Sequence, residues 1–348
     1  MNGLILFVAF VTFLWLGRTI LIPILVAVFL WYLINAIAAY YRKIMPFKSC
    51  RHDTECLLAS RSFDWISRGL AIATLCFVIY LFATQIRPMF SELLAVLPEI
   101  QDKMVNLGNY LSDMLGLKFD ASMLPNMTQI ASNVGTSAAS IVASIGMILV
   151  YMLFMFVEQS TFNRKFIAMF PNKLRSKKMR YILDSIDENM KKYLFIKTFI
   201  SAVTGLFSYI WLQVIGVEFA GVWAFIVFIT SYIPTFGAIV ACGLPIIYSL
   251  ATSPDLHQPL LTAGGLIGLQ ILFGNIIEPK LTGKTLNMST LAILINLVFW
   301  GMIWGVAGMF FSVPLLVATY IITAQFDSTR WIAVLLSADG NIPDKRDD

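Results

Sequence analysis

The sequence predicts an all-α polytopic membrane protein with about eight transmembrane helices, discontinuous or re-entrant helices in its C-terminal half, and an external helical segment. Of its 348 residues, 58% are apolar and 13% are charged, whereas about a quarter of the residues in a soluble chain are charged. The charges fall in blocks between long apolar runs, and the net charge is +5. A water-soluble enzyme with one polar surface is therefore excluded. The basic excess indicates membrane topology rather than nucleic-acid binding.

The N-terminal region, residues 1–87, contains three apolar runs. Residues 3–17 and a second run that ends at Tyr41 are expected to form a helical hairpin, although its first arm is short for a bilayer that requires about 20 residues. Residues 69–86 form the third span. Because no basic residue precedes Arg18 and no small-residue cleavage site is visible, a secretory signal is not expected.

The remaining spans lie in residues 137–157 and in a C-terminal transmembrane core, residues 196–326, followed by a tail at 327–348. Within the core, residues 196–216 form the fifth span, and five further apolar segments follow. Charged side chains are sparse in this core, and Pro and Gly residues interrupt it. The expected breaks are Pro234, Pro245, the Ser253-Pro254 turn, the Glu278-Pro279 pair and Gly308.

Loop charge predicts the orientation, because cytoplasmic loops accumulate Lys and Arg. Residues 42–68 carry six basic and three acidic side chains, and residues 158–195 carry nine and four. Residues 88–136 carry two basic and five acidic side chains. The first two segments are therefore expected inside and the third outside, with both termini in the cytoplasm.

The external segment, residues 88–136, has a heptad pattern. Its apolar residues recur at steps of three and four, which is typical of a coiled-coil seam. Pro98 falls inside this run and is expected to break or restart the helix. The segment packs either on a neighbouring subunit or on its own protomer. The seam residues are Phe90, Leu93, Leu97, Ile100, Met104, Leu107, Leu111 and Met114.

The cytoplasmic segment, residues 158–195, contains a basic amphipathic helix. Its apolar residues have helical spacing and lie among seven Lys and Arg residues, which favours a helix on the membrane surface beside anionic lipid. A calmodulin-like or nucleic-acid target is the alternative, and no other feature of the chain supports it. The apolar residues are Met179, Ile182, Leu183, Ile186 and Met190.

Cys50, His52, Asp53 and Cys56 share one loop and could be read as a metal cluster. Their spacing matches no common zinc pattern, and a short basic loop explains them better. We therefore expect no metal site and no cofactor.

Polar side chains in apolar surroundings carry the functional information, because burying them in hydrocarbon is costly. Lys197, Ser201 and Thr204 share one helix face, with Thr198 beside them. Lys197 either snorkels to the interface or lines a pathway. A second group surrounds Pro234, which is expected to bend or break the helix; irregular backbone at membrane depth is tolerated where it lines a wet cavity. This group comprises Thr230, Ser231, Tyr232, Pro234, Thr235 and Gly237.

Two further groups follow. Gln270, Asn275 and Glu278 precede Pro279, which is expected to end the helix. Glu278 either forms an ordinary loop ion pair with Lys280, which contributes little if exposed, or lines a pathway where it binds a proton, a cation or solute hydroxyls. The last group contains glycines that permit close helix packing. Its members are Asn296, Trp300, Gly301, Trp304, Gly305, Gly308 and Pro314.

These groups resemble the AI-2E family of bacterial membrane proteins, which includes autoinducer-2 exporters. The matching stretches run in order along residues 190–335, and the most specific is Asn275-x-x-Glu278-Pro279-x-x-x-Gly283. The others are Tyr193–Thr198 with Ser201 and Thr204-Gly205, Ser231–Gly237, Leu286–Ser289, Trp300-Gly301 through Gly308, and Val313–Leu315. In the first half of the chain the resemblance is one of hydropathy layout only.

The resemblance implies about eight membrane helices in the bacterial cytoplasmic membrane and a homo-oligomer, with a pentamer as the expected state. It also implies export of a small polar signal, the furanosyl diester autoinducer-2 with or without borate, although some relatives resemble sodium/proton antiporters. No phosphate loop or paired catalytic residue is visible, so we expect a non-enzymatic transporter driven by a gradient or running downhill. The alternatives are a cation/proton antiporter with Glu278 as the titrating group, and a membrane assembly factor that acts through residues 88–136.

Overall fold

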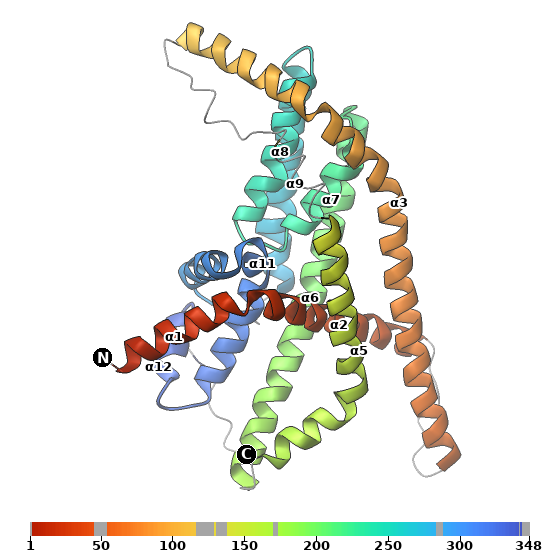
Figure 1. The fold of residues 1–348 in the computed structure, drawn as a ribbon, viewed down its shortest axis with the longest axis vertical. Coiled ribbons are helices and arrows are strands. Elements are labelled where there is room, and N and C mark those ends of the chain that lie inside the picture. Colours follow the sequence, from red (N-terminus) through yellow and green to blue (C-terminus); the bar gives the residue numbers. More distant parts are fainter. Residues whose placement is uncertain are drawn as a thin grey trace. The chain divides into compact units, whose positions relative to one another are not determined.

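The computed structural model describes residues 2–44, 54–115, 129, 138–169, 173–282, 288–340 and 342. Within these ranges the regular structure is helical, apart from one isolated antiparallel bridge between Met288 and Ser337. Figure 1 shows the long helices and their order along the chain. The prediction of an all-α membrane protein is confirmed.

Helices long and apolar enough to cross a bilayer are found at Arg18–Arg42, Ser176–Val214, His257–Leu281 and Thr290–Ala324. Shorter apolar helices are found at Trp65–Phe77, Ser144–Gln159, Ala220–Thr230 and Phe236–Thr252. The four long helices make the protein membrane-integral. Each of the shorter helices falls below the roughly 20 residues that a bilayer requires, so the expected number of about eight spans stays a prediction.

The chain folds into two compact units. Unit 1 comprises Met1–Phe77, Ser144–Lys197 and Lys280–Asp348, and unit 2 comprises Val78–Ala143 and Thr198–Pro279. Three long helices contribute residues to both units: α3 (Thr54–Leu115), α5 (Ala138–Ala168) and α6 (Lys173–Val214).

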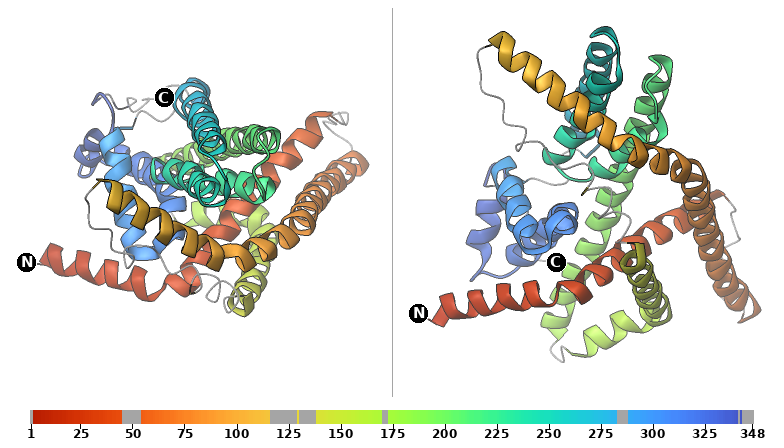
Figure 2. Two further views of the ribbon diagram at one scale, coloured as in Figure 1. Left: turned by 90° about the horizontal axis from the view of Figure 1, so that it is seen from above. Right: turned by 45° about the horizontal axis from the view of Figure 1, so that its top comes forward.

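Unit 1 begins with α1 (Asn2–Leu16) and α2 (Arg18–Ile44), which do not form the expected hairpin. The Gly17 amide donates to the Phe13 carbonyl at 2.9 Å, and the Gly17 carbonyl accepts from the Leu21 amide at 2.9 Å. The helical pattern therefore passes through the junction, and Figure 2 shows α1 continuing into α2 without reversing. A single Gly weakens a helix by roughly 1 kcal/mol and does not end it.

The expected surface helix of residues 158–195 is also different. The helix α6 runs without interruption from Lys173 to Val214, so its amphipathic part and its span are one element. Met190 packs against Val313, Leu316 and Val317 in a buried cluster. The apolar stripe is thus covered by the chain's own helix α11 (Thr290–Ala324) rather than by lipid. Amphipathic periodicity identifies an apolar face but not the surface that buries it.

Unit 2 contains the C-terminal part of α3 from Val78 onward and the part of α6 from Thr198 onward. It also contains three shorter helices, α7 (Ala220–Thr230), α8 (Phe236–Thr252) and α9 (His257–Gln270). The helix α3 continues through Pro88 and Pro98, so the break expected at Pro98 is absent. A proline removes one hydrogen bond and bends a helix, and Figure 1 shows α3 curved along its length.

The heptad seam of α3 packs on its own protomer at the positions that the structure describes. Leu93 and Ile100 are buried against Leu212, Trp223 and other residues of unit 2, and Met89 and Met104 flank them. Between the two alternatives for the external segment, these contacts favour packing within the protomer.

The helix α11 is a hairpin. Gly305 has φ 63° and ψ −142°, which is not helical. Asn296 Nδ2 donates to the Ser312 carbonyl at 2.6 Å, although residues 16 positions apart on a straight helix would be separated by about 24 Å. The chain therefore reverses at Gly305, which confirms a re-entrant element in the C-terminal half. The last described helix of unit 1 is α12 (Arg330–Leu336).

Candidate functional site

One face of α6 carries buried hydroxyl side chains inside an apolar span. Ser201 is fully buried, and Thr204 and Ser208 are almost so; spacings of three and four place all three on one face. The Thr204 hydroxyl donates to the Ile200 carbonyl at 2.8 Å. The Ser201 hydroxyl has no hydrogen-bond partner within the described part of the chain. Because an unsatisfied buried polar group costs about 1–3 kcal/mol, Ser201 is suited to hydrogen-bond a bound polar molecule.

Contacts on either side locate this hydroxyl stripe (Ser201, Thr204 and Ser208). A Cβ on Gly205 would lie 3.2 Å from the Ala224 carbonyl oxygen, so α7 packs closely there. Trp211 Nε1 donates to the Leu261 carbonyl of α9 at 3.0 Å. Gly205 and Trp211 are about 120° apart around the helix, and the stripe lies in the sector between them. It therefore lies between the sides of α6 that contact α7 and α9.

Lys197 begins the same face one turn earlier, and only 7% of its surface is exposed. Both alternatives for Lys197, snorkelling to the interface and lining a pathway, stay open.

The helix break at Pro234 is confirmed. The helix α7 ends at Thr230 and α8 begins at Phe236, and the turn between them contains Ser231, Tyr232, Pro234 and Thr235. The chain then runs back along α7, because the Tyr248 hydroxyl donates to Glu218 Oε2 at 2.9 Å. Pro245 lies inside α8 and does not interrupt it, so that expected break is wrong.

Two predicted groups meet at this turn. The Tyr232 hydroxyl, which is buried, donates to Thr198 Oγ1 at 2.8 Å. Phe228 packs edge-on to Tyr232, with ring centroids 5.8 Å apart. The bond between Tyr232 and Thr198 therefore connects the α7–α8 turn to α6 within unit 2.

The hydroxyls of the turn differ in what they can bind. Ser231 Oγ donates to the Val227 carbonyl at 2.6 Å, and Thr230 Oγ1 donates to the Ile226 carbonyl at 2.7 Å. Both donors are engaged by their own helix. Thr235 has an exposed side chain and a positive φ of 60°.

The third predicted group lies on a π-helix, η2 (Ile271–Ile277), which the sequence did not indicate. The Glu278 amide donates to the Phe273 carbonyl five residues earlier, and α10 (Glu278–Thr282) continues the helix through Pro279. The prediction that Pro279 ends the helix is therefore wrong. A wider turn accommodates the missing donor instead, and π-segments frequently mark functional sites.

The structure does not bring this third group to the α7–α8 turn. The ring of Phe273 packs on Phe207 of α6, with centroids 5.4 Å apart. Phe207 lies about 160° from Gly205 around the helix, so η2 and α7 contact opposite sides of α6. Along this helix Glu278 and Gln270 are half-buried, whereas Asn275 and Pro279 are exposed.

The fourth group forms the α11 hairpin, and packing explains it. A Cβ on Gly308 would lie 1.9 Å from the Trp300 carbonyl oxygen, so only glycine permits this approach of the two arms. Asn296 bonds both arms, since its Oδ1 accepts from Trp300 Nε1 at 3.1 Å while its Nδ2 donates to Ser312.

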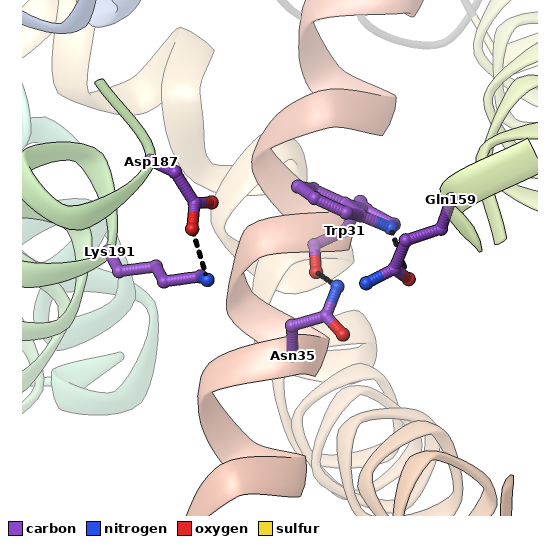
Figure 3. Close-up of polar contacts among 5 residues, drawn as sticks. All are labelled: Trp31, Asn35, Gln159, Asp187 and Lys191. Carbon is purple, nitrogen blue, oxygen red and sulfur yellow. Dashed lines mark hydrogen bonds and ion pairs between the residues drawn. The ribbon is translucent and has the colours of Figure 1, made fainter. Parts of the chain in front are cut away.

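A polar cluster in unit 1 was not predicted. Figure 3 shows Trp31 Nε1 donating to Gln159 Oε1 at 3.3 Å, and Asn35 Nδ2 donating to the Trp31 carbonyl at 2.9 Å. Lys191 pairs with Asp187 close by on α6, at 2.5 Å. Asn35 within an apolar run was a signal for this cluster. The metal cluster considered in the sequence analysis includes Cys50, His52 and Asp53, which lie outside the described residues. Gly283 also lies outside them.

Comparison with known proteins agrees with this arrangement. The family model of AI-2E family transporters matches residues 4–327. The chain is 31% identical over 285 residues to the AI-2 transport protein TqsA of Escherichia coli K12, covering 78% of this chain and 82% of that protein. It is 29% identical over 307 residues to a candidate transport protein of Haemophilus influenzae, covering 82% and 86% of the two chains. A family match over nearly the whole sequence, broken helices and a buried polar face lead to one conclusion: this chain belongs to the AI-2E family of membrane transporters.

Proposed function

We propose that this protein is a secondary transporter or facilitator that exports autoinducer-2, or a solute of the same small polyhydroxylated class, across a bacterial cytoplasmic membrane. The observation that carries the proposal is the Ser201 hydroxyl, which is fully buried and has no partner in the described residues. A solute rich in hydroxyls can supply the missing hydrogen bond. The name of the similar TqsA protein supports autoinducer-2 as the first solute to test.

The proposed route follows the hydroxyl stripe of α6 past the α7–α8 turn. Thr198 and Tyr232 bond each other across it, and Thr235 supplies a further hydroxyl. Ser231 contributes less than its sequence position suggested, because its donor is used by the Val227 carbonyl. The excess of Lys and Arg in residues 42–68 and 158–195 favours placing both segments in the cytoplasm. We further propose that the protein forms a homo-oligomer in contact with membrane lipid.

The test is autoinducer-2 efflux from liposomes that contain the purified protein, with and without an imposed proton gradient. Ser201→Ala is compared with Ser231→Ala as its matched control, because each removes one hydroxyl without adding volume. We expect Ser201→Ala to lower efflux by about ten-fold, the equivalent of one lost hydrogen bond, and Ser231→Ala to lower it much less. Equal effects of the two variants would remove the stripe from the pathway.

A cation/proton antiporter is the second candidate, and the π-helix favours it. Glu278 follows η2 directly and is half-buried, and a carboxylate at a distorted helix can carry a proton. Absence of autoinducer-2 efflux, together with sodium- or potassium-dependent proton movement that Glu278→Gln abolishes, would replace the exporter with this function.

A further inference from the structure

The turn between α7 and α8 holds Thr235 in a backbone conformation that threonine rarely adopts. Its φ is 60° and its ψ is −58°, and the Phe236 amide donates to the Pro234 carbonyl at 2.5 Å. A γ-turn is closed by a hydrogen bond between the first and third of three residues. Positive φ at the central residue, here Thr235, defines the rare and strained form of this turn. The β-branched side chain adds to the strain.

Glycine fills this role elsewhere in the described chain. Gly216, Gly305 and Gly340 all have positive φ. The α11 hairpin turns at Gly305, where no Cβ resists the conformation. Phe219 also has positive φ, but with ψ 29° it lies in the ordinary left-handed region. Threonine at the α7–α8 turn therefore retains strain that glycine would relieve.

Contacts on both sides hold the strained residue in place. Before it, the Tyr232 hydroxyl is bonded to Thr198 of α6. After it, a Cβ on Gly237 would lie 1.8 Å from the Thr230 carbonyl oxygen, so the first turn of α8 is pressed onto the end of α7. Strained residues persist only where the surrounding structure over-determines them. Release of the Tyr232 contact would consequently let Thr235 relax and change the direction in which α8 leaves the turn.

We propose that Thr235 is a strained hinge, and that the Tyr232–Thr198 hydrogen bond is the catch that holds it. The inference rests on the proposed function, because it assigns the hinge to the movement that transport requires. Relaxation of Thr235 offsets part of the cost of breaking the catch, so the held and released conformations lie closer in free energy. The strain thereby raises the population of the released conformation.

Thr235→Gly tests the hinge, because it removes the strain while the catch remains. Hydrogen–deuterium exchange is followed at the Phe236 and Gly237 amides of solute-free protein in nanodiscs. We expect exchange to slow about ten-fold in Thr235→Gly, to stay at the wild-type rate in Thr235→Val, which keeps the branched side chain, and to accelerate in Tyr232→Phe. Gly216→Ala is the control, since it adds strain at a positive φ outside the turn, where a Cβ has room.

Solute efflux is then measured on the same proteins. Thr235→Gly is expected to lower turnover by a factor similar to its slower exchange, and Gly216→Ala to leave turnover unchanged. Unchanged or faster amide exchange in Thr235→Gly would overturn the hinge, and slower exchange with unchanged efflux would overturn its role in transport. If wild-type protein carries no autoinducer-2, the proposed function fails, whereas the exchange data still decide whether Thr235 is a hinge.

Discussion

Two serines on neighbouring helices differ in what their hydroxyls bond. Ser201 Oγ is buried with no partner in the described part of the protein, whereas Ser231 Oγ donates to Val227. Ser201→Ala should therefore raise the free energy of unfolding by about 1 kcal/mol, because it removes an unsatisfied polar group, and Ser231→Ala should leave it equal or lower. Thermal unfolding in one detergent measures both. Destabilisation by Ser201→Ala would show that its hydroxyl is already satisfied. A variant that is more stable but transports less would separate function from folding.

Glycine positions in α8 give a second contrast at the residue scale. A Cβ at Gly237 would overlap the Thr230 carbonyl oxygen at 1.8 Å, while nothing lies within 4 Å of one at Gly243. Because the neighbour is backbone, Gly237→Ala should destabilise the protein by about 1–3 kcal/mol. Gly243→Ala should be neutral or slightly stabilising, since Ala favours helix over Gly. Equal unfolding midpoints for the two variants would contradict the close approach of α7 and α8.

Among the elements, α1 depends on the α11 hairpin for its position. Trp304 is buried, and its Nε1 donates to the Leu14 carbonyl at 3.0 Å. Trp304→Phe keeps most of the ring but loses this bond, so it should cost about 1 kcal/mol and accelerate amide exchange in α1. The matched control is Trp331→Phe, because Trp331 is exposed on α12. Faster exchange throughout the protein, rather than in α1, would argue against a local contact.

The sequence predicted the helix break at Pro234, but it failed at Pro98, Pro245 and Pro279. A proline removes one donor in every case, and the outcome depends on what the surrounding structure supplies. At Pro234 a γ-turn and a tight glycine contact end the helix, whereas before Pro279 a π-segment widens the turn. Such compensation depends on tertiary contacts that no local pattern contains. The sequence also placed a break at Gly308, whereas the chain reverses three residues earlier, at Gly305.

For the whole molecule, hydropathy was sufficient to predict membrane integration and an all-helical fold. It was not sufficient to identify what buries an apolar face. The stripe of α3 was expected to pack on either a neighbouring subunit or its own protomer, and the stripe of α6 on lipid. Leu93 and Ile100 of α3 and Met190 of α6 pack on the chain itself. Likewise, helical spacing correctly placed Ser201 and Thr204 on one face, but only the packing of α7 and α9 around α6 shows which side of the helix is enclosed.

Packing of α3 within the protomer leads to a prediction about assembly. Leu93 and Ile100 are 5% and 3% exposed and contact the core of unit 2. Leu93→Ala and Ile100→Ala should each destabilise the protein by about 2–5 kcal/mol, yet leave the number of subunits in the proposed homo-oligomer unchanged. Native mass spectrometry would give the subunit number, and Glu92→Ala and Asp102→Ala are controls on exposed positions of the same helix. Dissociation into monomers, without loss of monomer stability, would instead assign these residues to the interface between subunits.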